Sequence, residues 1–360
     1  MALETKRLRI AVVGAGLIGR RHVELIRASD ECSLAAVVDP TPASETLARE
    51  LGVPHFSTLH ALFGRARPDG AILATPNALH VDQALECLAA GVPALVEKPV
   101  AETVASGQRL AAAAGHSRVP VLVGHHRRHS PLIARAREII ASGRLGRIVA
   151  VTGTAMFCEP DRYFDEAPWR RQLGGGPILI NLIHEIDDLR TLCGEITDVQ
   201  AFASNATRGF EVEDTVAIGL RFASGALGTF LLSDSAACAK SWEQTSGENT
   251  SYASYPDEDC YLVAGTQGSL ALPTLKLKTY PGERSWWEPF HEERASVGRD
   301  DPLERQLAHF CAVIRREATP LCTVRDALET LRVTLAVAQA AGRPTPTDPA
   351  AHAVVAWSAA

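Results

Sequence analysis

The sequence predicts two α/β domains, the first built on a parallel sheet and the second on an open, mostly antiparallel sheet. At 360 residues the chain is about twice as long as a typical domain. Hydrophobic residues make up 46% and charged residues 22%, as in ordinary globular proteins. Short apolar runs alternate with helical patterns in residues 1–125, whereas strands follow one another closely in residues 126–360.

Each strand of the first domain is predicted from a short apolar run, the pattern of a strand buried inside a parallel sheet. These runs lie at residues 9–13, 34–39, 71–74, 94–96 and 119–123. Helices are predicted between them at residues 17–28, 44–51, 81–90 and 104–114. The repeated strand–helix–strand order implies right-handed crossover connections.

The second domain is predicted to hold a sheet with hairpin-like joins, interrupted by a helix at residues 178–192. Its strands are predicted at residues 148–157, 199–203, 215–222 and 226–232. Helices at residues 303–316 and 324–341 come last and are placed where they can pack back on the first domain. Residues 235–259 are polar and are predicted to lack regular structure, as in an active-site lid or an interface loop.

Composition excludes several classes of protein. No run approaches 18 apolar residues, and no signal peptide is recognisable, so we expect a cytoplasmic protein without a membrane span. The net charge of −6 argues against a nucleic-acid partner. The eight cysteines are scattered without a C-x-x-C pair, which is typical of reduced, buried thiols.

A glycine-rich turn follows the first strand and opens a helix: Gly14-Ala-Gly16-Leu17-Ile18-Gly19. Glycines at this spacing permit a tight turn in which a pyrophosphate binds to amides at the helix start. Asp39, at the end of the next strand, would accept hydrogen bonds from the adenosine ribose hydroxyls. A carboxylate there repels a 2′-phosphate and no arginine follows it directly, so the sequence favours NAD over NADP.

Two further loops follow strands at their carboxyl ends, where open α/β sheets bind ligands. Thr75, Pro76, Asn77 and His80 belong to the first loop, which lines the nicotinamide side of the cofactor unless Asn77 simply caps the next helix. The second loop is Glu97-Lys98-Pro99. Lys98 is either a donor that stabilises a substrate alkoxide or a surface lysine. Pro99 is expected to form a cis peptide that holds Lys98 inward.

In the second domain, a run of three glycines at residues 174–176 leads into an apolar helix that carries Asn181 and His184. Their spacing places both side chains on one helix face. Imidazole is the natural general base for removing a proton from an alcohol near pH 7, and a packed core histidine is the alternative.

Two tryptophans are candidates for binding the substrate. Trp169 would stack on a sugar-like ligand or pack in the core, whereas Trp242, in the polar segment 235–259, would contact such a ligand unless that segment is a surface or oligomer-interface loop. The run His125-His-Arg-Arg-His129 is a basic patch or a solvated charged segment. No carboxylate or cysteine stands beside the histidines in the sequence, so no metal is predicted.

The glycine turn with His22, the loop at residues 74–80, Glu97-Lys98-Pro99 and residues 174–187 together resemble the glucose–fructose oxidoreductase and inositol dehydrogenase (Gfo/Idh/MocA) family. The resemblance implies an N-terminal Rossmann domain and a C-terminal domain whose open sheet forms homodimers or homotetramers. It also implies Lys98 and His184 as catalytic residues and a reaction on a ring or sugar hydroxyl with NAD(P). In the family the stretch that corresponds to residues 125–129 approaches the substrate, so the resemblance implies that Arg127 or Arg128 meets an anionic or polyhydroxylated group.

One position departs from the family pattern. Inositol dehydrogenase-like members carry an aspartate four residues before the histidine, where this chain has Ile180. Asn181 is the nearest polar residue, but an amide cannot act as a base.

The sequence therefore predicts an NAD-dependent oxidoreductase acting on a secondary hydroxyl or ketone of a small polyhydroxylated compound such as a sugar, cyclitol or sugar acid. A cyclic dihydrodiol dehydrogenase is the nearest alternative. A non-catalytic NAD-binding regulatory protein is the alternative from another class, and retention of Lys98 and His184 argues against it.

Overall fold

The computed structural model describes residues 6–343, which divide into two compact units. The first unit contains residues 6–123 and 323–328, and the second contains residues 124–322 and 329–343. Among the described residues, no helix has both the length and the apolar character that a membrane span requires.

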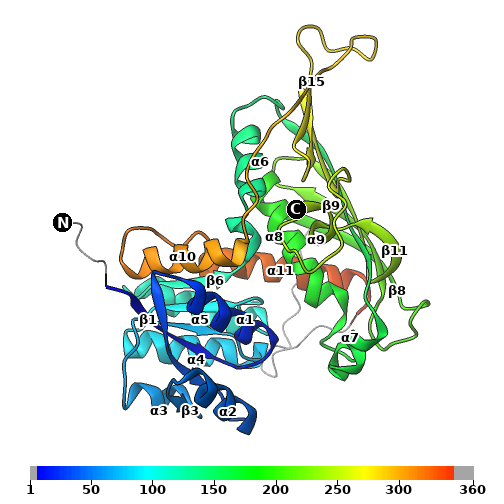
Figure 1. Ribbon diagram of the computed structural model, residues 1–360. Coiled ribbons are helices and arrows are strands. Elements are labelled where there is room, and N and C mark those ends of the chain that lie inside the picture. Colours follow the sequence, from blue (N-terminus) through cyan, green and yellow to red (C-terminus); the bar gives the residue numbers. More distant parts are fainter. Residues whose placement is uncertain (1–5, 344–360) are drawn as a thin grey trace, which may run out of the picture. The chain divides into compact units, whose positions relative to one another are not determined.

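The first unit is built on a six-stranded parallel sheet, which confirms the predicted fold class (Figure 1). Its strands are β1 (Leu8–Val13), β2 (Cys32–Val38), β3 (His55–Phe56), β4 (Gly70–Leu73), β5 (Ala94–Glu97) and β6 (Val121–Gly124). The helices that connect them are α1 (Leu17–Ala28), α2 (Pro42–Leu51), α3 (Leu59–Phe63), α4 (Asn77–Ala90) and α5 (Val104–His116). The strand order β3-β2-β1-β4-β5-β6 reverses direction at β1 and β4, and such a switch point is where doubly wound sheets bind ligands.

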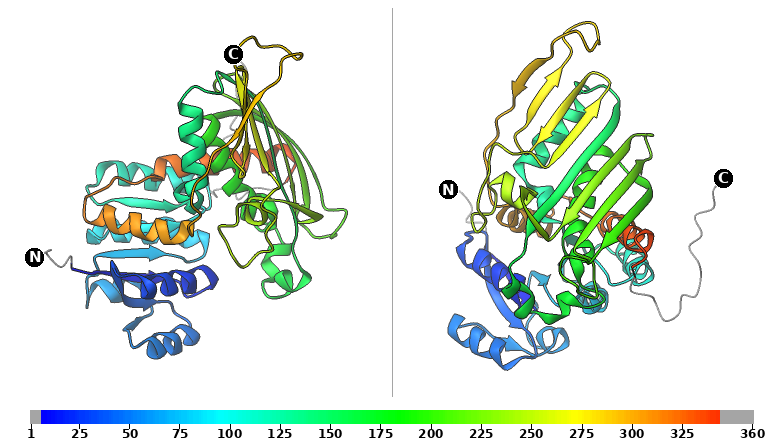
Figure 2. Two further views of the ribbon diagram at one scale, coloured as in Figure 1. Left: turned by 45° about the horizontal axis from the view of Figure 1, so that its top comes forward. Right: turned by 90° about the vertical axis from the view of Figure 1, so that its right-hand side faces the viewer.

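The second unit is built on a larger mixed sheet in the order β15-β14-β13-β12-β7-β10-β9-β8, with β11 paired to β7 (Figure 2). β10 runs parallel to β7, and the other described pairs of this sheet are antiparallel. Its strands are β7 (Ile148–Cys158), β8 (Ile196–Ser204), β9 (Thr215–Phe222), β10 (Leu227–Ser233), β11 (Ser235–Lys240), β12 (Tyr261–Gly265), β13 (Gly268–Leu272), β14 (Lys276–Thr279) and β15 (His291–Arg294).

Burial alternates along the strands of this sheet, so that one face packs on a hydrophobic core and the other is exposed. The helices of the second unit are α6 (Pro131–Ala141), α7 (Asp161–Asp165), α8 (Ile183–Cys193), α9 (Trp242–Ser246), α10 (Pro302–Ile314) and most of α11 (Val324–Ala340). Short 3₁₀ turns lie at η1 (His126–His129) and η2 (Pro168–Arg171). The predicted helix at residues 178–192 begins with a π-helical turn, η3 (Ile178–Leu182).

The prediction that residues 235–259 lack regular structure is wrong for the first half of the segment. Residues 235–240 form β11 and residues 242–246 form α9. The physical reason is Trp242, which is 1% exposed and stacks on Tyr261 at a centroid distance of 5.7 Å. A buried aromatic ring of this size anchors the polar residues around it.

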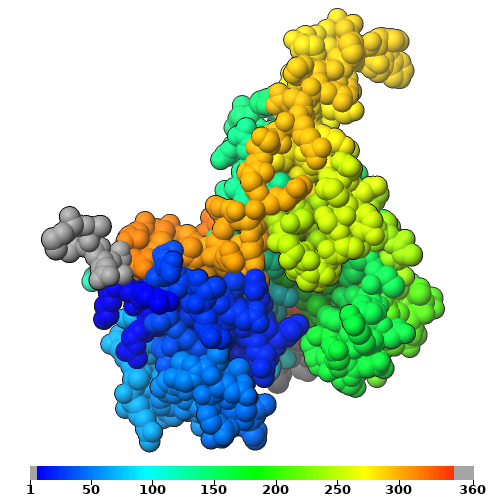
Figure 3. Space-filling view, viewed as in Figure 1, coloured from blue at the N-terminus to red at the C-terminus, as the bar shows by residue number. Residues whose placement is uncertain are grey.

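Sequence reasoning also missed the strands β12 to β15. The connection between β14 and β15 projects from the rest of the second unit as a narrow arm (Figure 3), and Trp286 and Trp287 on it are 85% and 81% exposed. Of the eight cysteines, six are buried, whereas Cys158 is exposed and Cys238 half-buried.

Candidate active site

The glycine turn of the first unit connects β1 to α1 through backbone contacts that only glycine permits. Gly14 has φ +92°, and a Cβ there would lie 2.5 Å from the carbonyl oxygen of Ala74. A Cβ on Gly19 would lie 1.9 Å from the carbonyl oxygen of Gly14. Gly16 differs, because a Cβ on it would meet nothing within 4 Å. Gly14 and Gly19 are therefore required by the fold, whereas Gly16 faces open space.

The residues at the start of α1 fit a dinucleotide. Gly16 precedes the helix without a side-chain cap, so its first amides are available to an anion. The Leu17 side chain is 83% exposed, which is unusual for a leucine and suits an apolar ligand surface. Ile18, next to it, is half-buried. An NAD pyrophosphate would thus bind to the first amides of α1, next to Gly16, where a Cβ would meet nothing within 4 Å.

Asp39 lies beside the same turn. Its Oδ2 accepts a hydrogen bond of 2.9 Å from the amide of Ala15, and its Oδ1 accepts bonds from the amide and hydroxyl of Thr41 at 2.8 and 2.6 Å. Burial alone would raise the pKa of Asp39, but these hydrogen bonds outweigh it and lower the pKa below its usual value. The side chain is therefore an anion at neutral pH, as the prediction of NAD preference requires.

The two loops after β4 and β5 are fixed from behind by histidines. One ring nitrogen of His80 lies 2.7 Å from the carbonyl oxygen of Pro99 and the other 2.9 Å from that of Thr75. His22 Nε2 lies 2.7 Å from Glu97 Oε1, and both side chains are buried. His80 and Glu97, predicted to contact the cofactor, thus position the loops instead, because their polar atoms face the protein.

The remaining predicted cofactor residues lie on these loops with different exposure. Pro76 and Asn77 are exposed, and the Thr75 hydroxyl donates to Gln83 Oε1 at 2.6 Å. Asn77 does not cap α4, which starts without a side-chain cap after Pro76. Lys98 is half-buried directly after β5, and the Lys98–Pro99 peptide is cis, as the sequence indicated.

In the second unit, His184 is half-buried on α8 and lies among other histidines. The ring of His126 meets it edge-on at a centroid distance of 5.0 Å, and the ring of His125 lies at 6.5 Å. The sequence offered a core histidine as the alternative for His184, but its partial exposure and polar neighbours favour a functional role.

Asp187, one turn after His184, is 1% exposed and lies 3.7 Å from His125 Nδ1. Arg128 donates to both of its oxygens, at 2.8 and 2.7 Å, and the Thr330 hydroxyl donates at 2.9 Å. Burial would raise the pKa of Asp187, but His125, Arg128 and Thr330 together lower it. Sequence reasoning missed this carboxylate, although its i,i+3 spacing from His184 was a visible signal.

The potential ligand atoms of His125, Asp187 and Cys322 lie within 4.8 Å of one another. The structure thus supplies the carboxylate and cysteine that are not adjacent to His125 in the sequence. However, the Arg128 guanidinium engages both oxygens of Asp187 and brings a positive charge to the cluster. These contacts do not favour a cation, and we propose no metal here.

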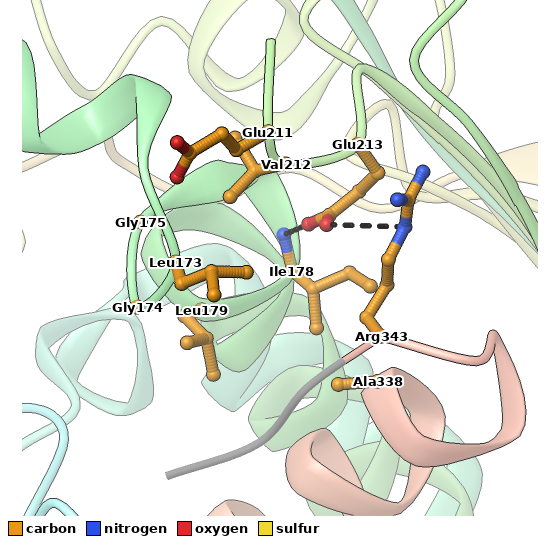
Figure 4. A pocket seen from close by; sticks show the side chains of 10 residues that line it. All are labelled: Leu173, Gly174, Gly175, Ile178, Leu179, Glu211, Val212, Glu213, Ala338 and Arg343. Carbon is orange, nitrogen blue, oxygen red and sulfur yellow. Dashed lines mark hydrogen bonds and ion pairs between the residues drawn. The ribbon is translucent and has the colours of Figure 1, made fainter.

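The helix that carries His184 is held at its start by Glu213, whose carboxylate accepts a 3.0 Å hydrogen bond from the amide of Ile178. Figure 4 shows Glu213 in a small pocket with Arg343, whose Nε lies 4.0 Å from the carboxylate. A Cβ on Gly176 would come within 2.7 Å of Glu213 Oε1. The glycine run before the helix therefore allows a carboxylate to approach the first free amide.

Arg127 does not reach outward to a substrate as the sequence suggested. It is 5% exposed and donates to Glu185 at 2.8 Å, to Asp188 at 3.1 Å and to Glu243 at 3.1 Å. Tyr261 adds hydrogen bonds from its hydroxyl to Glu185 and Asp188. Desolvation would lower the pKa of Arg127, but the three carboxylates hold it well above its usual value. Arg127 is thus a buried counterion.

The predicted substrate-binding tryptophans have opposite environments. Trp242 lies in the core and its Nε1 donates to Glu248 at 3.1 Å, so it is not available to a ligand. Trp169 is 53% exposed on η2, beside the guanidinium of Arg170. Asn181 is half-buried on η3. Burial raises the pKa of Glu159 to about 7, and Asn181 is among the groups that oppose this shift.

Comparisons with protein-family models match both units of the chain. An oxidoreductase family with an NAD-binding Rossmann fold matches residues 8–125. A GFO/IDH/MocA C-terminal domain matches residues 133–271.

Among curated proteins, the chain is 33% identical to the rhizopine catabolism protein MocA of Rhizobium meliloti over 56% of this chain and 62% of that protein. It is 27% identical to 1,5-anhydro-D-fructose reductase of Ensifer adhaerens over 92% and 96% of the two chains. Among solved structures, the WlbA dehydrogenase of Bordetella pertussis in complex with NADH and UDP-GlcNAcA aligns with a TM-score of 0.74. That alignment has 24% identity and covers 95% of this chain and 100% of the other, which establishes a shared fold.

Proposed function

The chain belongs to the GFO/IDH/MocA family of NAD(P)-dependent oxidoreductases, and on this basis we propose that it oxidises a secondary hydroxyl of a sugar, cyclitol or sugar-acid-like compound with NAD, or reduces the corresponding ketone. The observation that carries the proposal is Lys98, half-buried directly after β5 in the same sheet as the glycine turn. When bound, NAD would supply the hydride acceptor.

Two side chains do the acid–base work in this proposal. His184 takes the proton from the substrate hydroxyl, because a neutral imidazole is a base matched to neutral pH. Lys98 donates a hydrogen bond to the same oxygen and stabilises the negative charge that develops on it. Each group acts most strongly in the transition state, so its loss should lower kcat more than it raises KM.

The proposed substrate class is supported by similarity to proteins named for activities on sugars and cyclitols. Besides the 1,5-anhydro-D-fructose reductase, the chain is 24% identical to an inositol 2-dehydrogenase of Rhizobium meliloti over 93% of its length. These proteins act on ring compounds with several hydroxyl groups, and the half-buried polar side chains around His184 suit such a ligand.

The first test is NAD⁺ reduction by the purified protein with myo-inositol, D-glucose, D-glucuronate and a benzoate cis-dihydrodiol. We expect Lys98→Ala and His184→Ala each to lower kcat on the order of 10²–10⁴-fold, with NADH affinity nearly unchanged. Lys276→Ala and His291→Ala, at exposed positions, serve as matched controls. A His184→Ala enzyme with near-normal kcat would show that His184 is only structural.

A second candidate function is a cyclic dihydrodiol dehydrogenase. The chain is 28% identical over 61% of its length to a 1-carboxy-3-chloro-3,4-dihydroxycyclohexa-1,5-diene dehydrogenase of Comamonas testosteroni. Preferential turnover of the dihydrodiol in the same panel identifies this function. Tight NADH binding without turnover of any compound would instead indicate a non-catalytic NAD-binding protein.

We further propose that the exposed face of the larger sheet joins copies of the chain into a homodimer or homotetramer. Phe202 is 84% exposed, and Leu231 lies two strands away in the same row, since both pair with Ala217. Leu227 and Leu262 extend this apolar surface. Phe202→Asp with Leu231→Glu should reduce the mass measured by light scattering to that of a monomer; an unchanged mass would disprove this interface.

A further inference from the structure

His80 connects the two loops that follow β4 and β5, and both of its printed contacts are to backbone carbonyl groups. Its Nδ1 lies 2.7 Å from the carbonyl oxygen of Pro99, and its Nε2 lies 2.9 Å from that of Thr75. The side chain is 1% exposed, so water has little access to either nitrogen. One buried ring therefore joins the residue directly after Lys98 to the loop that the sequence assigns to the nicotinamide side of the cofactor.

The chemistry of the imidazole ring limits how many of these contacts are hydrogen bonds at one time. A carbonyl oxygen only accepts, so each ring nitrogen must carry a proton to bond to it. A neutral imidazole has one N–H and one bare nitrogen, whereas an imidazolium has two N–H groups. The neutral ring can thus hold Pro99 or Thr75, and only the imidazolium can hold both.

The surroundings of His80 determine when the ring carries its second proton. Burial lowers the pKa of His80 below its usual value, and the positive charge of Lys98 acts in the same direction. The two carbonyl oxygens and the carboxylate of Glu97 oppose this shift. Glu97 is itself paired with His22 at 2.7 Å. The ring is therefore neutral at pH 7 and gains a second proton only as the pH falls.

The contact with Pro99 is the one that bears on Lys98. The amide of Lys98 donates a 3.3 Å hydrogen bond to Glu97 Oε2, and His80 Nδ1 reaches the carbonyl group of the next residue. These two contacts hold the backbone on both sides of Lys98. The contact with Pro99 is also the shorter of the two at His80, so we expect the single proton of the neutral ring on Nδ1.

We propose that His80 is a positioning residue for Lys98: its Nδ1–H holds the carbonyl group of Pro99 at neutral pH, and a second proton on Nε2 also secures the carbonyl group of Thr75. The inference rests on the proposed function, since Lys98 is the catalytic group that His80 positions. In acid, one ring ties both loops together. As the pH rises, the loop after β4 loses its bond to the ring, and the binding of NAD should weaken.

Two variants separate the links, because the amide nitrogen of asparagine lies near the position of Nδ1 and that of glutamine near the position of Nε2. His80→Asn keeps a donor for Pro99, and His80→Gln keeps one for Thr75. At pH 7.5 we expect His80→Gln to lower kcat for the best compound of the panel on the order of tenfold, because Lys98 is displaced. His80→Asn should stay within about threefold of wild type.

His60→Asn, at an exposed position in the same unit, is the control and should behave as wild type. Equal losses in the two variants at position 80 would show a purely structural role, and a larger loss in His80→Asn would place the important link at Thr75. Either result would overturn the proposal.

Binding of NAD⁺ measures the second link without turnover. By calorimetry, the wild-type Kd should rise on the order of threefold to tenfold between pH 5 and pH 7.5, as Nε2 loses its proton. Asp39 stays ionised over this range, because its pKa lies below its usual value of 3.8. The Kd of His80→Asn should not change with pH, since an amide takes up no proton. The same pH dependence in wild type and variant would contradict the second link.

The protons on the ring are observed directly in wild-type protein labelled with ¹⁵N-histidine and ¹³C-proline, in which proximity to the carbonyl carbon of Pro99 identifies the Nδ1 signal. We expect a proton on Nδ1 alone at pH 7.5, and on both nitrogens in a growing fraction of molecules as the pH falls to 5. A proton on Nε2 alone at pH 7.5, or a ring without a second proton at pH 5, would overturn the proposal even if the variants fail to fold.

The proposed function fails separately, if wild-type protein oxidises no compound of the panel. In that case the ring protonation and the Kd for NAD⁺ still decide whether His80 holds the two loops as proposed.

Discussion

The candidate residues of the two units are held in position in different ways. In the first unit the turn after β1 is shaped by backbone: Gly14 and Gly19 approach carbonyl groups so closely that no side chain fits. In the second unit the surroundings of His184 are made of side chains from distant segments, with Asp187 held by Arg128 and Thr330. The shape of the glycine turn therefore depends on a few adjacent residues, whereas the surroundings of His184 depend on side chains from many segments.

This difference determines how each half should respond to mutation. In the first unit, a methyl group added at Gly19, where it would collide with the backbone, should disrupt the turn. A methyl group added at Gly16, where it meets no protein atom within 4 Å, should weaken only the binding of the cofactor. In the second unit, removing a buried charged side chain such as Arg127 should leave its oppositely charged partners buried without a counterion.

The largest effect is expected from Gly19→Ala. Its Cβ would lie 1.9 Å from a backbone carbonyl oxygen, so the turn itself must move. We expect a loss of about 5 kcal/mol in the free energy of unfolding, measured by urea denaturation, and no detectable NADH binding.

Gly16→Ala is the matched control, because its Cβ meets nothing within 4 Å. Its free energy of unfolding should stay within about 0.5 kcal/mol of wild type, while its Kd for NADH rises on the order of tenfold or more. Equal destabilisation by the two variants would show that both glycines serve the fold alone.

The second effect is that of Arg127→Ala, which tests the side-chain half. The change leaves Glu185 and Asp188 buried without the guanidinium that now lies 2.8 and 3.1 Å away. We expect a destabilisation of about 3 kcal/mol by thermal or urea unfolding. Arg135→Ala removes an exposed pair with Glu138 and should cost about 0.5 kcal/mol or less. If Arg127→Ala has the same unfolding free energy as wild type, the ion pairs of Arg127 contribute little to stability. The sequence-based prediction that Arg127 binds the substrate would then have to be tested again.

The same contrast explains what sequence reasoning could reach. The parallel sheet, the glycine turn and Asp39 were predictable because each is encoded locally, by periodicity or by a short motif. The surroundings of His184 were not, since Asp187 and Thr330 are 143 positions apart. The predictions for Trp242 and Arg127 were wrong for a related reason, since polar neighbours in the sequence suggested that both side chains are exposed. In the structure Trp242 packs against Tyr261, and Arg127 is paired with three carboxylates from distant segments.

A third, smaller effect concerns Glu248, which is 8% exposed and accepts hydrogen bonds from Trp242 and Ser130. Burial raises its pKa to about 7 from a value near 4.5. Between these values the unfolded chain ionises while the folded protein keeps the proton, so stability is lost as pH rises from about 4.5 to 7. Glutamine does not ionise, so Glu248→Gln avoids this pH-dependent loss of stability. The variant should be more stable than wild type by about 2 kcal/mol at pH 8, with little difference at pH 4.5.

The measurement is the difference in unfolding free energy between variant and wild type across this pH range. Glu283→Gln, at an exposed position, should show no such trend. A pH-independent difference for Glu248→Gln would mean that the pKa of Glu248 is the same in the folded and the unfolded protein.

The smallest effect, and the one that returns to the backbone-defined half, is that of Asp39 on cofactor choice. Its carboxylate is ionised and lies against the glycine turn through Ala15, where it would repel the 2′-phosphate of NADP. Asp39→Ala should narrow the NAD/NADP ratio of kcat/KM on the order of tenfold, about 1.4 kcal/mol.

Asp39→Asn separates charge from geometry, because it retains an acceptor for the Ala15 amide while removing the negative charge. If repulsion decides the preference, both variants shift the ratio. If the hydrogen bond to the turn decides it, only Asp39→Ala does, and the first unit's selectivity would then depend on its backbone. A wild-type enzyme that already prefers NADP would show that Asp39 does not select the cofactor.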